Sequence, residues 1–348
     1  MQTQTQTRTR NQTLECFKFI ASVFVVFIHI KFPDRFGELM TCLARFAVPL
    51  FFTISGYFSY RVSSRHVEKR MVNILKLLFL GWLLYFSWSS IYLLWTGGNL
   101  AEFFRTAIPD ARGIYQWLVL SMDPFYGHLW FLSALVLSYG ILWVYLRFFE
   151  REDVDYRPLY EIGTVLMFLQ FLLDEFFLTL GVQIPFYAYR NAFLTGLPFL
   201  TLGLFLREYQ QHLILTFRLT EKKLFGMIAV ALGVSVFEWY GIGTCDVYCG
   251  TVLTVIAMVL YAAVHPTVAR SPLVEHWICR MGSISTVVYL THLSVLDFYS
   301  AFIRWRIEAV LFDKEAWLGP IFVALISIIA SACCIWAWDL VKRIFKKK

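Results

Sequence analysis

Charged residues are scarce in this chain: only 16% of its 348 residues are Asp, Glu, Lys or Arg, whereas 59% are hydrophobic. Soluble domains carry about a quarter of their residues as charges, so the composition excludes an ordinary soluble protein. The apolar runs are about as long as a bilayer core is thick. The sequence therefore predicts an all-α polytopic integral membrane protein.

The motifs of several enzyme classes are also missing. The sequence contains no Walker loop, no GxGxxG after a strand, no HExxH and no GxSxG elbow. No dense set of carboxylates suggests a metal centre, so we expect neither a bound metal nor a bound cofactor. Lys and Arg collect in alternate loops, which is a topology signal rather than a nucleic-acid patch.

Ten apolar segments can be identified, at 14–31, 41–60, 73–95, 128–148, 160–180, 191–206, 223–241, 247–265, 282–302 and 317–340. With the N-terminus in the cytoplasm, 21 of the 31 Lys and Arg residues fall in inside segments and eight in outside ones. This bias follows the positive-inside rule. It predicts about ten transmembrane helices with both termini cytoplasmic.

One membrane domain fills most of the chain. We expect residues 1–13 to be a disordered cytoplasmic tail, 14–341 the transmembrane domain and 342–348 a basic cytoplasmic tail. The first apolar segment lacks a small-residue cleavage site, so it is not expected to be a signal peptide. The long outer loop at 96–127 is too short to span and either lies on the surface or folds back as a lid.

Three ionisable side chains mark the first apolar segment, with Glu15 and Lys18 near its start and His29 near its end. On an α-helix, Lys18 and His29 differ by about 20° of rotation and roughly 16 Å of rise. Ionisable groups within a membrane segment usually face a cavity or a partner. Either the three residues line a functional cavity, or they mark the two headgroup edges of the bilayer.

Other candidate residues lie near the same outer boundary. Arg45 precedes Pro49, which is expected to kink or break the second helix, so Arg45 either lines a cavity or snorkels to headgroups. His128 and Trp130 begin the fourth helix, where His128 either meets His29 or bonds to a loop carbonyl. Trp at this depth is typical of an aromatic belt.

The later helices add Arg190 at the outer start of the sixth segment and His292 within the ninth. His292 is either neutral and hydrogen-bonded within the bundle or part of a site. Asp174 and Glu175 have no obvious chemical role, and pairing with Arg190 is the structural explanation that we expect.

Cys245 and Cys249 flank a short loop, CDVYC. They could form a disulfide if the loop faces an oxidising compartment. Two thiols without further Cys or nearby His are too few ligands for a typical zinc site.

This arrangement resembles the membrane-bound acyltransferase-3 family, bacterial O-acyltransferases that modify cell-envelope glycans. The resemblance runs along almost the whole chain. The matching residues are Glu15, Lys18 and His29 in the first helix, Phe51, Phe52 and Gly56 in an FFxxxG motif, His128 and Trp130 in HLWFL, and Tyr289 and His292 in YLxH. The family usually has Arg where this chain has Lys18, and Arg45 lies farther from the Phe pair than is common.

The resemblance implies an acyl-CoA donor, usually acetyl-CoA, and an acceptor hydroxyl on a cell-envelope or exported glycan. It also implies a multi-pass protein of the bacterial plasma membrane. It implies His29 as general base or acyl relay. Lys18, Arg45 and Arg190 would hold the anionic CoA or polarise the reacting carbonyl. The remaining expected site residues are Glu15, His128 and His292 in catalysis and Trp130 in substrate binding.

A second function fits the same residues. A transporter or flippase for a small polar solute or a lipid-linked sugar would use an Arg- and His-lined cavity without covalent chemistry. Solute flux in the absence of acetyl-CoA distinguishes it from the acyltransferase.

Overall fold

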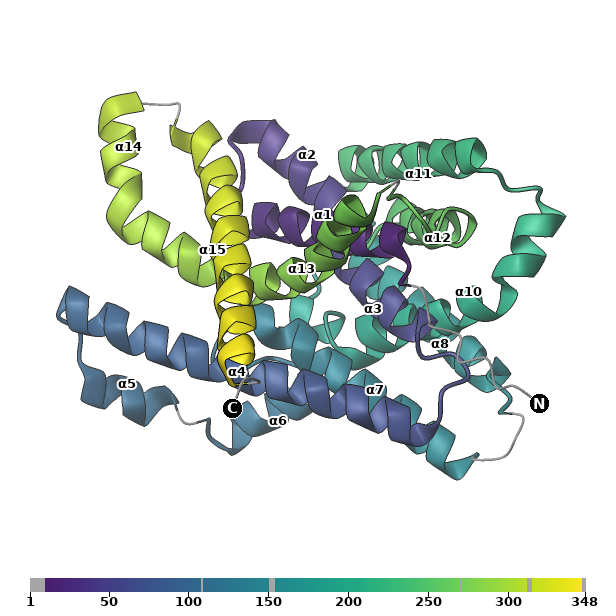
Figure 1. Cartoon of the computed structure of the whole chain (residues 1–348), viewed down its shortest axis with the longest axis horizontal. Helices are drawn as coiled ribbons and strands as arrows, with labels where there is room; N and C mark the ends of the chain where they lie inside the picture. The colour runs from purple at the N-terminus through teal and green to yellow at the C-terminus, as the bar shows by residue number, and fades with distance from the viewer. Residues whose placement is uncertain (1–9, 108, 150–153, 270, 312–314, 346–348) are drawn as a thin grey trace.

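The computed structural model describes residues 10–107, 109–149, 154–269, 271–311 and 315–345, and every regular element in these ranges is helical (Figure 1). The α-helices are α1 (Gln12–His29), α2 (Asp34–Ala44), α3 (Ala47–Tyr57), α4 (Ser64–Thr96), α5 (Leu100–Ala107), α6 (Ala111–Leu120), α7 (Trp130–Phe148), α8 (Arg157–Phe171), α9 (Phe177–Thr179), α10 (Leu197–Thr216), α11 (Glu221–Ile242), α12 (Cys249–Val264), α13 (Pro272–Phe298), α14 (Arg304–Leu311) and α15 (Glu315–Phe345). The shorter helical turns are η1 (Gly127–Leu129), η2 (Leu172–Phe176), η3 (Phe186–Ala188), η4 (Ala192–Gly196) and η5 (Tyr299–Ile303).

Eight helical stretches of the described chain are long and apolar enough to cross a membrane. This confirms the predicted fold class, a multi-pass all-α membrane protein. Two of the ten predicted segments, 191–206 and 247–265, correspond to α10 and α12, which are not among the eight; α12 is apolar but has only 16 residues. The number ten and the cytoplasmic placement of both termini stay predictions.

The first helix begins earlier than its apolar run suggests. The Asn11 side chain caps α1 by accepting a hydrogen bond from the Leu14 amide, and Gln12 accepts from the amides of Val268 and Ala269. Polar side chains that satisfy buried backbone donors extend the helix into the sequence expected to be a tail. Residues 1–9 of that tail and residues 346–348 of the basic tail lie outside the described residues.

The segment predicted at 41–60 is two helices. The helix breaks at Arg45 and Phe46, between the end of α2 at Ala44 and the start of α3 at Ala47. This break lies about one helical turn before Pro49. Pro49 lies in the first turn of α3, where its missing N–H has no helical partner to lose. The break therefore leaves Arg45 at a helix end, on a turn that faces the interior of the bundle.

The α1 helix lies near the middle of the bundle, where it packs along α13 and contacts α2, α3 and α15 (Figure 1). Nearby, α3 and α10 approach so closely that backbone meets backbone. A Cβ atom on Gly56 would lie 1.8 Å from the Leu200 carbonyl oxygen, and one on Gly203 would lie 2.0 Å from the Thr53 carbonyl oxygen. Small residues allow such contacts between membrane helices, which explains the glycine of the FFxxxG motif.

The described residues of the long loop at 96–127 form α5, which contacts α4, and α6, which contacts α7. The Trp117 indole N–H donates to the Ser133 hydroxyl over 2.9 Å, and the Trp117 ring lies 5.2 Å from that of Trp82. Asp123 accepts a hydrogen bond from the Trp82 indole over 2.8 Å. These contacts tie the end of the loop to the bundle just before His128.

Candidate functional site

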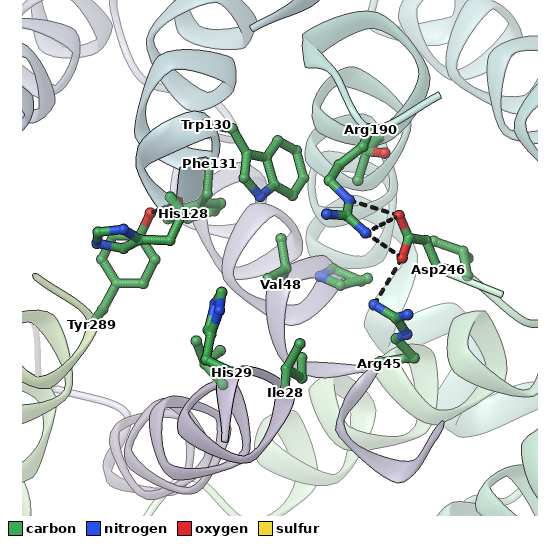
Figure 2. A pocket seen from close by; sticks show the side chains of 14 residues that line it. Ile28, His29, Arg45, Val48, His128, Trp130, Phe131, Arg190, Asp246 and Tyr289 are labelled. Atoms are coloured by element: carbon green, nitrogen blue, oxygen red, sulfur yellow. Dashed lines mark hydrogen bonds and ion pairs between the residues drawn. The ribbon is translucent and has the colours of Figure 1, made fainter. Parts of the chain in front are cut away.

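Two cavities lie at opposite ends of α1. We call the first the histidine cavity, which is lined by residues from six parts of the chain: His29, Arg45, His128, Trp130, Phe131, Arg190, Asp246 and Tyr289 (Figure 2). We call the second the Lys18 cavity, which is lined by Arg10, Glu15, Lys18, Arg70, Phe131 and Tyr289 among others. The histidine cavity measures about 80 Å³ and the Lys18 cavity about 450 Å³.

Two histidines, His29 and His128, line the histidine cavity, and His292 packs against both of them. The ring centroid of His29 lies 5.0 Å from that of His292 and 6.4 Å from that of His128, and the latter two are 5.1 Å apart. His29 is exposed to the cavity, whereas His128 and His292 are 4% and 1% exposed. One accessible imidazole is therefore backed by two buried ones.

The buried imidazoles have unused nitrogen atoms. His292 Nδ1 lies 2.8 Å from the Tyr289 carbonyl oxygen and 3.1 Å from that of Val288. Carbonyl oxygens only accept, so Nδ1 carries the hydrogen and Nε2 of the neutral ring is an acceptor. Among the described residues, neither His292 Nε2 nor either ring nitrogen of His128 makes a hydrogen bond of good geometry. Buried polar atoms without hydrogen-bond partners are rare in folded proteins. A catalytic role is one explanation for those that occur.

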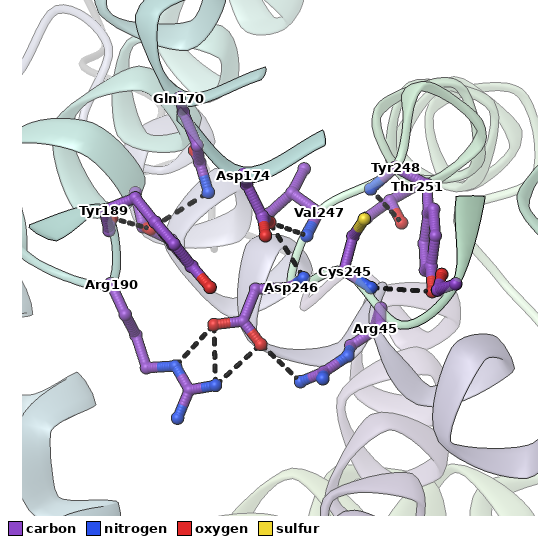
Figure 3. Close-up of polar contacts among 12 residues, drawn as sticks. Arg45, Gln170, Asp174, Tyr189, Arg190, Cys245, Asp246, Val247, Tyr248 and Thr251 are labelled. Carbon is purple, nitrogen blue, oxygen red and sulfur yellow. Dashed lines mark hydrogen bonds and ion pairs between the residues drawn. The ribbon is translucent and has the colours of Figure 1, made fainter. Parts of the chain in front are cut away.

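Opposite the histidines, two arginines share one carboxylate (Figures 2 and 3). Arg190 binds Asp246 through Nε and Nη2, each over 2.6 Å, and Arg45 Nη1 lies 2.7 Å from Asp246 Oδ1. Burial would raise the pKa of the Asp246 carboxyl, but Arg45 and Arg190 hold it below its usual range. The group therefore stays an anion, and the cluster of the three side chains carries a net charge of +1.

The sequence did not identify Asp246, although it lies in the CDVYC loop that drew attention for its cysteines. Asp174 fixes this loop, because its Oδ2 accepts hydrogen bonds from the Asp246 and Val247 amides over 2.8 and 3.0 Å (Figure 3). The predicted pairing of Asp174 with Arg190 is therefore wrong. Arg190 pairs with Asp246, and Asp174 holds the backbone of Asp246 in place. Asp246 lies in a short loop that the predicted topology places on the same outer side as Arg45 and Arg190. This position was the signal in the sequence for an ion pair.

The aromatic residue Trp130 borders the same cluster. The Arg190 guanidinium lies 5.9 Å from the Trp130 ring centroid and 5.0 Å from that of Phe186. Such stacking favours Arg over Lys, because the planar guanidinium lies flat on a ring while its edge donates hydrogen bonds. Trp130 therefore fixes the arginine as well as lining the cavity.

The Lys18 cavity holds the other expected site residues. Lys18 Nζ lies 2.7 Å from Glu15 Oε2, and Arg10 Nε lies 3.4 Å from Glu15 Oε1. Glu15 is 4% exposed and packs on Gly282, where a Cβ atom would lie 1.4 Å from Glu15 Oε2. Glu15 and Lys18 therefore line a cavity formed with α13, and the glycine leaves the room that the carboxylate needs.

The structure does not bring Lys18 to the histidines. The two cavities share only two of their lining residues, Phe131 and Tyr289. The Tyr289 hydroxyl donates to the His128 carbonyl oxygen over 2.6 Å, and its ring is 5.3 Å from that of Phe131. These two aromatic side chains form the partition between the cavities.

One group of described residues could hold a metal ion, and it lies away from both cavities. Ligand atoms of Glu175, Glu238 and Cys249 all fall within 4.8 Å of one another. Cys249 is exposed, Cys245 is buried, and both are free thiols. Cys245 and Cys249 are therefore not joined by a disulfide.

The comparison with protein families gave one match. A family model described as an acyltransferase domain matches residues 11–339 of the chain, which includes every residue of the histidine cavity. Neither the curated proteins nor the solved structures gave a match.

Proposed function

The chain belongs to the acyltransferase-3 family and is a membrane acyltransferase, and we propose that it moves an acetyl group from acetyl-CoA to a hydroxyl of a cell-envelope or exported glycan. The observation that carries this proposal is the exposed His29 imidazole backed by two buried imidazoles. A catalytic base for a sugar hydroxyl needs an accessible imidazole whose orientation is fixed by its neighbours.

His29 is the residue that handles the proton. Its imidazole takes the proton of the acceptor hydroxyl while the oxygen attacks the thioester carbonyl carbon. The carbon–sulfur bond then breaks, and the CoA thiolate takes the proton from the His29 imidazolium. The ester carries the acetyl group, and CoA leaves as the thiol, so the His29 ring returns to its starting form.

His292 acts as a positioning residue in this scheme. Because its Nδ1–H is held by two backbone carbonyls, its Nε2 presents a fixed acceptor beside the His29 ring. An acceptor there selects the tautomer and the orientation of a neighbouring imidazole. His128 closes the other side, with its backbone held by the Tyr289 hydroxyl.

The Lys18 cavity suits the donor. Arg10, Lys18 and Arg70 offer cations to the phosphates of CoA, and the rest of the wall is largely apolar. With roughly 16 Å of helix rise between Lys18 and His29, an extended pantetheine arm would run past Phe131 and Tyr289 to bring the thioester to the imidazole. No resident cofactor is needed in this scheme.

The proposed orientation follows from the donor. Acetyl-CoA is a cytoplasmic molecule, so the Lys18 cavity would face the cytoplasm and the histidine cavity the exterior, with both termini inside the cell. The excess of Lys and Arg in the alternate loops supports this orientation. A bacterial plasma membrane would supply the donor on one side and the glycan on the other.

The test is the transfer of label from radioactive acetyl-CoA into the glycan and lipid fractions of membranes that contain the full chain. We expect label with the native protein and none above background with His29→Ala. His212→Ala is the matched control, because His212 lies exposed on α10 and lines neither cavity.

Absence of label in every fraction, with folded protein and envelope acceptors present, would contradict the proposal. Uptake of a solute or sugar by vesicles that lack acetyl-CoA would then favour the transporter. Label that persists in His29→Ala membranes would leave the acyltransferase but remove His29 from its chemistry.

A further inference from the structure

The cluster of Arg45, Asp246 and Arg190 has more cationic groups than its own ion pairs require. Two guanidinium groups share a single carboxylate in ion-pair contact, whereas the nearby acid Asp174 accepts hydrogen bonds from the Asp246 and Val247 amides, so the three-residue cluster has one more cation than anions. Arg45 Nε is buried and has no hydrogen-bond partner among the described residues. A guanidinium has five N–H donors, and the hydrogen bonds and ion pairs to Asp246 occupy only some of those on the two arginines.

The donor does not account for this surplus charge. The phosphates of CoA have cations of their own in the Lys18 cavity, which Phe131 and Tyr289 separate from the histidine cavity. What passes the partition is the uncharged pantetheine and the thioester. The acceptor is the reactant that remains to contact the arginines.

The cluster is built to stay fixed and charged. Asp174 holds the Asp246 loop through two amides, and the Arg190 guanidinium lies against the Trp130 and Phe186 rings. Figure 2 shows the cluster on the side of the cavity opposite His128 and Tyr289. A molecule bound between the two sides would meet the arginines with one group and His29 with another.

We propose that Arg45 and Arg190 bind an acidic group of the acceptor, a carboxylate or a phosphate, so that the acceptor is an acidic sugar or glycan. Planar guanidinium groups bind both kinds of oxyanion with two hydrogen bonds. The small volume of the histidine cavity suits the acidic group and the reacting hydroxyl rather than a whole polymer. The proposal rests on the proposed acyl transfer for the identity of the second reactant.

The experiment measures binding of glucose, glucuronate and glucose 6-phosphate to the purified full chain by calorimetry, without acetyl-CoA. We expect the native protein to bind at least one acidic sugar about tenfold or more tightly than glucose. Preference for glucuronate alone would identify a carboxylate, and preference for glucose 6-phosphate alone a phosphate. Equal dissociation constants for the three sugars, or no binding of any of them, would overturn the proposal.

Variants assign the preference to the arginines. Arg45→Gln and Arg190→Gln should lose it, Arg190→Lys should retain part of it because Lys is a point charge without a fork, and His212→Gln should retain it fully. The proposal would be overturned if Arg190→Lys and either of the Gln variants kept the native preference for acidic sugars over glucose. Arg190→Lys keeps the positive charge that pairs with Asp246. It therefore tests the preference even if a Gln variant does not fold.

A second readout excludes a role at the reacting carbonyl. In assays of CoA release, the Gln variants should raise KM for the acidic sugar about tenfold or more, and their loss of kcat/KM should be larger with the acidic sugar than with glucose. Equal loss of kcat with neutral and acidic acceptors would instead assign the arginines to the carbonyl oxygen and overturn the proposal. If no acceptor releases CoA but the binding preference is present, the acyltransferase proposal fails and acid binding stands.

Discussion

The two ends of α1 use charge differently. At Lys18 the charges are paired within and near one helix, by Glu15 at 2.7 Å, and they line a large cavity. At His29 the arginines are paired by Asp246 from a distant loop, and the imidazoles beside them have nitrogen atoms without partners. The first arrangement suits holding a charged molecule, and the second suits chemistry on a small group.

The two ends of α1 differ because different parts of the chain cover them. The Lys18 end meets α13 at Gly282, and the His29 end meets His128 and His292. Substitutions at the two ends should therefore change different kinetic constants.

The largest effect is expected for His29→Gln, which keeps a polar side chain but removes the base. Transfer should fall about 10²–10⁴-fold in kcat, as for loss of a general base, whereas KM for acetyl-CoA should stay near its native value. Initial rates at several acetyl-CoA concentrations measure both constants. An unchanged kcat would remove the distinction between the two cavities.

Asp246→Asn should destabilise the histidine end more than any change at the Lys18 end. Two partly exposed guanidinium groups would lose their common carboxylate, so the free energy of unfolding should fall by about 2–3 kcal/mol. Thermal unfolding in detergent measures the change. Asp339→Asn is the control, because Asp339 pairs with Arg280 at a more exposed site and should cost no more than about 1 kcal/mol.

Lys18→Gln should weaken donor binding without slowing the chemistry. Loss of one charge-assisted contact to a phosphate should raise KM for acetyl-CoA about tenfold, with kcat nearly unchanged. Lys69→Gln is the matched control, since Lys69 is exposed on α4 and does not line the Lys18 cavity. A fall in kcat as large as that of His29→Gln would show that the two ends act as a single site.

Gly282→Ala should give the smallest change. Its Cβ would lie 1.4 Å from Glu15 Oε2 and 3.3 Å from Lys18 Nζ, so the carboxylate must move and Lys18 loses its fixed position. We expect KM for acetyl-CoA to rise about fivefold at most, the equivalent of one ion pair. Gly140→Ala is the control, because its Cβ would meet only Met71 Sδ at 3.9 Å; an equal effect of both substitutions would argue against the pair.

Local properties of the sequence predicted the class of protein and most of its helices. Apolar length and helical period are local properties, so the chain alone predicts which segments span and that Lys18 and His29 share a stripe. The motif order predicted the family. The same local information placed the break of the second segment within one turn of its position after Ala44.

Which polar groups meet at the site depends on the tertiary structure. His128 and His292 are more than 160 residues apart and approach His29 from separate helices, while Asp246 joins Arg45 and Arg190 from a loop that had drawn attention only for its cysteines. Helix association in lipid depends on close packing and polar contacts rather than on burial from water. Hydropathy therefore does not encode partner faces, and backbone contacts such as Gly56 on Leu200 decide them.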